Sequence, residues 1–215
     1  MENNKESNKE SNNWKVTVIT AFFTLVLGLA TAWFAYNQNT KDKMTDLKIE
    51  QLKQDKDNEL ATNNRHIAII YGELWSLMLK LDADRCFIIQ PHPEHKHIFL
   101  SVAHEVARKG ISPVKDIFQN IPISDMASFT KDAATNVWIY YDDVDKQVND
   151  KKALSMMNLS GSTQICIRQL VNAKNSWIGN LVIENIDIKS FNRQESMEII
   201  TNTANTIQFI LPTIN

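Results

Sequence analysis

Residues 163–186 read TQICIRQLVNAKNSWIGNLVIENI and contain the main evidence for the fold. Two runs rich in Ile, Leu and Val, at 163–171 and 177–186, are joined by the polar sequence NAKN. β-Branched residues favour extended backbone, and a short polar loop joins strands that run antiparallel. The sequence therefore predicts a β-hairpin in the last third of the chain.

Three further runs of strand-forming residues precede this hairpin. RCFIIQ at 85–90 and HIFLSVAHEVA at 97–107 flank the loop PHPEHK, and NVWIYY lies at 136–141. The first two suit a hairpin connection. Residues 111–123 contain two prolines and are expected to be irregular. These runs extend the predicted antiparallel sheet.

Two helices with matching apolar stripes are predicted, one before and one after the strands in the sequence. The helix-pairing stripe is Ile67, Ile70, Leu74, Leu77 and Leu81 at 64–82, with Met197, Ile200, Ala204, Ile207 and Leu211 at 193–211. Spacings of three and four place each set on one helix face. The two helices are expected either to pack side by side on the sheet or to pair between subunits. Asn192 and Glu195 form a capping-box-like start for the last helix.

Two short helices complete the pattern, at 124–134 with Ser124 as N-cap and at 151–159 before Gly161. The order of elements predicts an α+β domain around an antiparallel sheet, covering 64–215.

An apolar run precedes this domain. Residues 14–36 read WKVTVITAFFTLVLGLATAWFAY, with Lys15 as the only charge. At ~1.5 Å per residue this run covers the ~30 Å hydrocarbon core of a bilayer. It is apolar on every face, which favours a transmembrane helix over a buried helix. A cleaved signal peptide is the other alternative, although no clear cleavage site follows the run.

The segments around the span are polar. Residues 1–13 repeat NKES and are predicted to be a disordered tail, and residues 37–63 are predicted to be a charged helical stalk. Within the span, Thr24, Gly28 and Ala32 recur at every fourth position, a spacing that favours transmembrane association. Lysines are nearly balanced on the two sides, with a slight bias towards a cytoplasmic C-terminal domain.

The composition argues against several other classes. With 23 basic and 25 acidic side chains, nucleic acid is not an expected partner. Cys86 and Cys166 are too few for a disulfide scaffold. They are expected to be small core residues, and the alternative is a single disulfide in an oxidising compartment.

No motif predicts catalysis, a metal or a cofactor. The cluster His92, Glu94, His95 and His97 contains metal-binding residue types, but a hairpin loop splays alternate side chains, so a solvated loop is expected. Asp142, Asp143 and Asp145 lack the Gly and Glu of an EF-hand and are expected to form a solvated turn. His104 has no nucleophile of recognised spacing.

DADRCFII at 82–89, NVWIYYDDV at 136–144 and WIGNLVIENI at 177–186 occur in the order seen in GAF domains. Over about 67–211 the chain resembles that family of small-molecule sensors, which is related to the PAS fold. The resemblance implies a GAF/PAS-like antiparallel sheet flanked by helices. The chain departs from bilin-binding members in having no cysteine at their attachment position, and from cyclic-nucleotide-binding members in lacking their motif residues.

The layout of a tail, one span, a charged helix and an α+β domain also resembles the T-even bacteriophage holins. DADRCFIIQPHPEHKHIFL at 82–100 and the closing hairpin and helix fall in corresponding places. This resemblance implies an oligomer that permeabilises the bacterial host inner membrane, with a soluble domain bound by a regulatory protein. In that family the domain faces the periplasm, against the lysine bias.

These features predict a non-enzymatic single-pass membrane protein, with the lipid bilayer and further copies of itself as partners. A holin-like lysis protein is the favoured hypothesis. The alternative is a membrane-anchored GAF-like sensor for a small ligand or partner protein, and a third hypothesis is a membrane scaffold.

Overall fold

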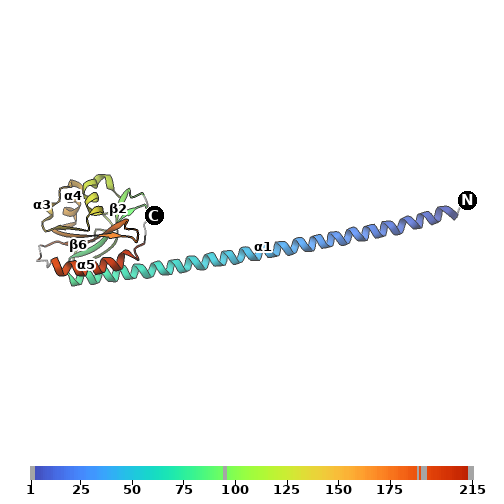
Figure 1. The fold of residues 1–215 in the computed structure, drawn as a ribbon, viewed down its shortest axis with the longest axis horizontal. Coiled ribbons are helices and arrows are strands. Elements are labelled where there is room, and N and C mark those ends of the chain that lie inside the picture. The colour runs from blue at the N-terminus through green and yellow to red at the C-terminus, as the bar shows by residue number, and fades with distance from the viewer. Residues whose placement is uncertain (1–2, 94–95, 188, 190–192, 213–215) are drawn as a thin grey trace. The chain divides into compact units, whose positions relative to one another are not determined.

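A computed structural model describes residues 3–93, 96–187, 189 and 193–212 (Figure 1). The contacts divide the chain into two compact units, Met1–Leu60 and Ala61–Asn215. The boundary falls close to the predicted start of the α+β domain at residue 64.

The first unit is helical. The helix α1 extends over Asn3–Lys80, and its segment Thr17–Gln38 is long and apolar enough to cross a membrane, with a mean hydropathy of 2.0. An apolar N-terminal helix is therefore present where one was predicted; a signal sequence meets the same criterion. Residues 3–13 differ from the predicted disordered tail because they are helical. Their Glu and Lys residues favour helix, and extending an existing helix avoids the cost of nucleation.

The second unit is built around one six-stranded sheet in which every neighbouring pair is antiparallel. The strands are β1 (Arg85–His92), β2 (Phe99–Ala107), β3 (Ile121–Pro122), β4 (Trp138–Tyr141), β5 (Gln164–Val171) and β6 (Trp177–Asn185), in the order β3-β2-β1-β6-β5-β4. This confirms the α+β class and the predicted β5–β6 hairpin. The short strand β3 was not predicted, because the two prolines of residues 111–123 indicated irregular chain.

Helices cover both faces of the sheet, as Figure 1 shows. The end of α1 and α5 (Arg193–Gln208) lie on one face, here called the α1/α5 face. The opposite face, here called the α2/α4 face, is covered by the 3-10 turn η1 (Ile123–Met126), α2 (Ala127–Thr135), α3 (Val144–Gln147) and α4 (Lys151–Ser160). Each face has its own hydrophobic cluster.

The predicted helix-pairing stripe lies mainly under the sheet. The fully buried members are Ile70, Leu74, Leu77, Ile200, Ala204 and Ile207, while Leu81 and Leu211 are partly buried against them. Burying a Leu or Ile contributes roughly 1.5–3 kcal/mol, so this stripe is a main source of the unit's stability. Ile67 is half-buried and Met197 is 37% exposed, at the edges of the stripe. Pairing between subunits through these residues stays a prediction.

The cap predicted at Ser124 is wrong. Ser124 lies inside η1, and α2 begins at Ala127 after Met126, without a side-chain cap. Pro122 is the residue before η1, and its fixed φ suits a tight turn that starts earlier than the polar residues suggested. The end of α4 at Gly161, with φ +75°, agrees with the prediction. Asn192, the other predicted cap, lies outside the described residues.

Gly179 explains the Ile-Gly-x-Leu pattern of β6. Its φ is +152°, and a Cβ atom there would lie 2.5 Å from the Ile89 carbonyl oxygen. Glycine alone has the backbone freedom for this close approach of β6 to β1. The glycine therefore permits the pairing of the two central strands.

The two cysteines are free and buried. Cys86 and Cys166 both pair with Ile183, from opposite sides of β6. Neighbouring strands lie about 4.8 Å apart, so a whole strand between the cysteines exceeds the ~7 Å limit for a disulfide. The prediction of small core residues is confirmed, and the disulfide alternative is wrong.

Candidate functional site

The α2/α4 face encloses an apolar cavity of about 40 Å³. Its lining combines aromatic and methionine side chains with one carboxylate: Phe87, Ile89, Phe118, Met126, Phe129, Ala153, Met156, Met157, Ile165, Ile167, Val182 and Glu184. Small-molecule pockets usually measure about 300–1,000 Å³. The cavity, here called the closed cavity, is therefore too small for a ligand of that size, and such a ligand would fit only if the lining side chains moved.

The strand pattern directs the lining residues to this face. In β1, Phe87 belongs to the cluster on the α2/α4 face, whereas Cys86 and Ile88 belong to the cluster on the α1/α5 face. Side chains alternate between the two faces of a strand, so both clusters arise from one continuous apolar run. Three methionines come from η1 and α4. The part of the lining that η1 and α4 contribute is here called the lid. Unbranched methionine side chains adapt readily to a new shape, which makes the lid the deformable part of the site.

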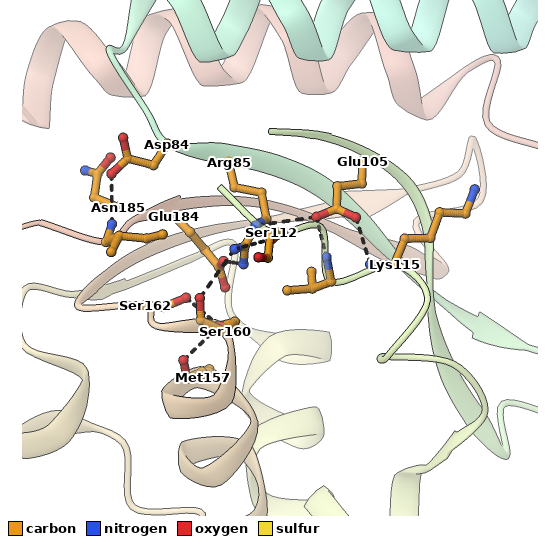
Figure 2. Close-up of polar contacts among 12 residues, drawn as sticks. Asp84, Arg85, Glu105, Ser112, Lys115, Met157, Ser160, Ser162, Glu184 and Asn185 are labelled. Carbon is orange, nitrogen blue, oxygen red and sulfur yellow. Dashed lines mark hydrogen bonds and ion pairs between the residues drawn. The ribbon is translucent and has the colours of Figure 1, made fainter. Parts of the chain in front are cut away.

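A buried charge cluster lies at one end of the cavity, centred on Arg85 (Figure 2). The Arg85 side chain is 1% exposed; its Nη1 donates to Glu184 Oε2 at 2.7 Å, and its Nε lies 3.4 Å from Glu105 Oε1. Its Nη2 donates to the carbonyl oxygens of Ser112 at 2.9 Å and Ser160 at 3.3 Å. One guanidinium thus connects three strands to two segments outside the sheet.

The two carboxylates extend this network. Glu105 accepts hydrogen bonds from the backbone N–H groups of Val114 at 2.8 Å and Lys115 at 2.7 Å. The hydroxyls of Ser160 and Ser162 lie 2.7 Å apart, and Ser160 donates to the Met157 carbonyl oxygen at 2.8 Å. Figure 2 shows these serines at the end of α4, directed towards Glu184. The network therefore anchors the lid of the cavity to the sheet.

The charge of this cluster depends on pH. Burial raises the pKa of Glu184 to about 7, although the neighbouring Arg85 opposes the shift. A buried carboxylate without full compensation favours its neutral form. Near neutral pH a proton therefore exchanges at a group that lines the cavity, and the local charge falls by one unit as the pH rises through this range.

The structure gives His92 and His97, from the predicted metal-like loop, different partners. His92 Nε2 lies 2.8 Å from the Ser101 hydroxyl, and the His97 ring lies edge-on to Trp177. Glu94 and His95 lie outside the described residues. No group of three or more His, Cys, Asp or Glu side chains is placed to hold a metal within the described ranges.

The acidic turn caps a helix. The Asp143 carboxylate accepts a hydrogen bond from the backbone N–H of Lys146, at the start of α3, and pairs with the Lys146 ammonium at 2.6 Å. Asp143 therefore serves as the N-cap of α3, within the turn that was predicted to be solvated.

The transmembrane association residues Thr24, Gly28 and Ala32 lie in the apolar segment of α1 and are exposed. The Thr24 hydroxyl donates to the Thr20 carbonyl oxygen at 2.8 Å, within the same helix. No atom lies within 4 Å of the position of a Cβ on Gly28. This face has room for a second helix, and its role in association stays a prediction.

Sequence reasoning missed Arg85, Glu105 and Glu184. The available signal was one arginine or glutamate within each of three predicted strand segments, RCFII, SVAHEV and NLVIEN. Long charged side chains are rarely fully buried unless they are paired. Three such residues in predicted strands indicated a buried ion-pair cluster.

No protein-family model and no curated protein sequence matches the chain. Solved structures do match its fold. The third GAF domain of a Synechocystis protein, in its photoproduct state, has a TM-score of 0.54 and 14% identity over 66% of this chain and 89% of that one. The PixJ GAF domain of Thermosynechococcus elongatus, in its blue-light-absorbing form, has a TM-score of 0.56 and 12% identity, over 69% of this chain and 88% of that one.

A phycoerythrobilin-bound GAF domain from a cyanobacterial phytochrome has a TM-score of 0.51 and 15% identity, over 69% of this chain and 93% of that one. Identities this low establish the fold alone. The matches agree with the α+β fold of this unit, an antiparallel sheet flanked by helices. The unit Ala61–Asn215 has the fold of a GAF domain.

Proposed function

We propose that this chain is a non-enzymatic, membrane-anchored regulatory protein, in which a GAF-like domain senses a small ligand and α1 carries the response. One observation supports this above all. The same helix contains the apolar segment Thr17–Gln38 and the stripe Ile70, Leu74 and Leu77 that packs under the sheet. A change in the domain that alters the packing of this stripe acts directly on the helix that enters the bilayer.

The closed cavity supports a small apolar ligand rather than a bilin. Phycoerythrobilin, bound by one of the structural neighbours, is far larger than a cavity of about 40 Å³. Cys86 and Cys166 lie in the cluster on the opposite face of the sheet, where they cannot attach a pigment in this cavity. An aromatic molecule of one or two rings matches the lining and requires only displacement of the methionine side chains.

Exposed residues of α1 support self-association. Trp75 is 49% exposed and Leu79 is 58% exposed, and Ala68 and Gly72 precede them on the same helical face. This spacing gives an apolar stripe directed away from the sheet. We propose that two copies of the domain pair through this stripe, and that ligand binding changes how they pair.

Ligand binding is tested with the full chain purified in detergent and with indole as the probe. Indole is expected to raise the melting temperature of the wild type, and Ala153→Phe, which fills the cavity, is expected to abolish the increase. Lys131→Met, on the exposed side of α2, serves as the control and keeps the wild-type response. Equal stabilisation of all three proteins would exclude binding in the cavity.

Self-association is tested with single cysteines at exposed positions of α1. Trp75→Cys is expected to form a disulfide-linked dimer under mild oxidation in membranes, because the native Cys86 and Cys166 are buried. Lys131→Cys, on α2, is the matched control and should remain monomeric. Equal cross-linking at both positions would contradict pairing through α1.

A further inference from the structure

A second hollow lies apart from the closed cavity. It is an open groove of about 440 Å³ at the ends of β1 and β2. Its lining is mostly polar: Gln90, His92, Ser101, Val102, Ala103, His104, Lys115, Gln119, Asn120 and Pro212. None of these residues lines the closed cavity. The volume falls within the usual range of small-molecule pockets, about 300–1,000 Å³.

The walls of the groove are held by hydrogen bonds. The Ser101 hydroxyl accepts from the backbone N–H of Asn120 at 2.8 Å and lies 2.8 Å from His92 Nε2. Gln119 Nε2 donates to the Val102 carbonyl oxygen at 2.8 Å, and Gln90 Nε2 donates to the Pro212 carbonyl oxygen at 3.0 Å. These bonds fix the polar groups before any ligand arrives, which lowers the entropy cost of binding.

Two buried polar atoms of the lining have no hydrogen-bond partner among the described residues. They are Gln90 Oε1 and His104 Nδ1, on side chains whose residues are only 3% and 8% exposed. Buried polar groups are nearly always paired, so an unpaired atom in the wall of a groove requires an explanation. Gln90 Oε1 is an acceptor and requires a donor from the occupant.

The charge of the groove favours an anion. Lys115 is the one lysine, arginine, aspartate or glutamate in the lining, and its ammonium forms no ion pair with any described residue. The carboxylate of nearby Glu105 is already bound by Arg85 and by two backbone N–H groups. Burial and the charge of Lys115 lower the pKa of His104 to about 4, so its imidazole is neutral near pH 7.

We propose that the groove binds a small anion that also carries a hydroxyl or N–H donor, with a 2-hydroxy carboxylate as the simplest example. The Lys115 ammonium binds the anionic oxygens, and Gln90 Oε1 accepts the hydrogen bond from the hydroxyl. The His104 ring lies 5.5 Å, edge-on, from the ring of Tyr71 in α1. An occupant that bonds to His104 therefore acts on α1 from the opposite face to the closed cavity.

Glycolate and acetate test this assignment because they differ only in the donor hydroxyl. Their binding to the full chain in detergent is measured by calorimetry, with the apo melting temperature of each variant as the check on folding. Glycolate is expected to bind at least about tenfold more tightly than acetate, which corresponds to one well-made hydrogen bond. Lys115→Met is expected to weaken the binding of both anions at least about tenfold, because it removes one charge-assisted contact.

Gln90→Met should remove the preference for glycolate while leaving acetate binding unchanged, and Lys131→Met, far from the groove, should change neither. In the wild type, glycolate should also shift the NMR signals of the His104 ring. Equal affinity for the two anions, affinity unchanged in Lys115→Met, or an unmoved His104 signal at saturation would each overturn the proposal. The indole experiment does not depend on this groove, so the two proposals fail separately.

Discussion

The two faces of the sheet are packed in different ways. On the α1/α5 face, the end of α1 and α5 pack a periodic apolar stripe against the strands. On the α2/α4 face, short helices and turns cover the strands, and they leave a cavity next to a buried cluster of Arg85, Glu105 and Glu184. The α1/α5 face therefore supplies much of the stability and carries the attachment to α1, whereas the buried charges and the cavity leave the core of the α2/α4 face more open to rearrangement.

Removal of Arg85 is expected to have the largest effect on this comparison. Arg85→Met leaves two carboxylates buried without their partner, and breaking a buried ion pair typically costs about 3–5 kcal/mol. The loss should be greater at about pH 8 than at about pH 6, because Glu184 has a pKa of about 7 and is mostly neutral at the lower value. Urea unfolding of the full chain in detergent, followed by tryptophan fluorescence, measures it. A cost that is the same at about pH 6 and about pH 8 would contradict a pKa of about 7 for Glu184.

A matched pair of core truncations compares the faces directly. Leu77→Ala, at a fully buried position on the α1/α5 face, is expected to cost about 3–5 kcal/mol, near the upper part of the range for such changes. Met157→Ala, in the deformable lid of the α2/α4 face, is expected to cost about 1–3 kcal/mol less, because the lid can relax around the gap. The same unfolding assay measures both. Equal costs would contradict the claim that the two faces are packed differently.

A smaller effect is expected from Glu184→Gln. The folded pKa of Glu184 is raised from 4.5 to about 7, so the folded state holds the proton more tightly and the wild type loses stability as the pH rises between these values. Each pKa unit corresponds to about 1.4 kcal/mol, so the loss is of the order of a few kcal/mol. Glutamine does not titrate, and the variant should gain stability relative to wild type as the pH rises.

His104 contributes with the opposite sign in an overlapping range. Its pKa is lowered from 6.5 to about 4, so stability falls as the pH drops between those values. Both proteins keep His104, so the difference between the Glu184→Gln and wild-type profiles isolates Glu184. A constant difference from about pH 5 to about pH 8 would contradict the raised pKa.

The regular parts of the molecule were predictable from sequence. The stripes of α1 and α5, the β5–β6 hairpin and the end of α4 at Gly161 follow from local periodicity and turn chemistry, which act over a few residues. They led to the α+β class and to the GAF-like fold. Local rules also predicted a helix cap at Ser124. Ser124 instead lies inside η1, which begins directly after Pro122.

The candidate sites were not predictable in the same way. The Arg85 cluster joins residues about 20 to 100 positions apart, and its partners meet only because β1 lies between β2 and β6. The groove likewise depends on Pro212 reaching Gln90 across most of the domain. The sequence analysis favoured the holin-like hypothesis, and the structural neighbours establish the GAF fold alone. The holin-like hypothesis itself stays a prediction.

The central claim, a membrane-anchored regulatory protein, is tested most directly by expressing the full chain in a bacterium beside Gly28→Leu. Alkaline extraction of membranes shows whether each protein is retained in the membrane. Membrane potential and culture density are followed in the same cultures. Full-length protein retained in the membrane, with steady potential and normal growth for both chains, is the result expected here. Cleavage after the apolar segment with release of the domain would contradict anchoring, and a sudden loss of potential that Gly28→Leu delays would contradict the regulatory role in favour of a holin-like one.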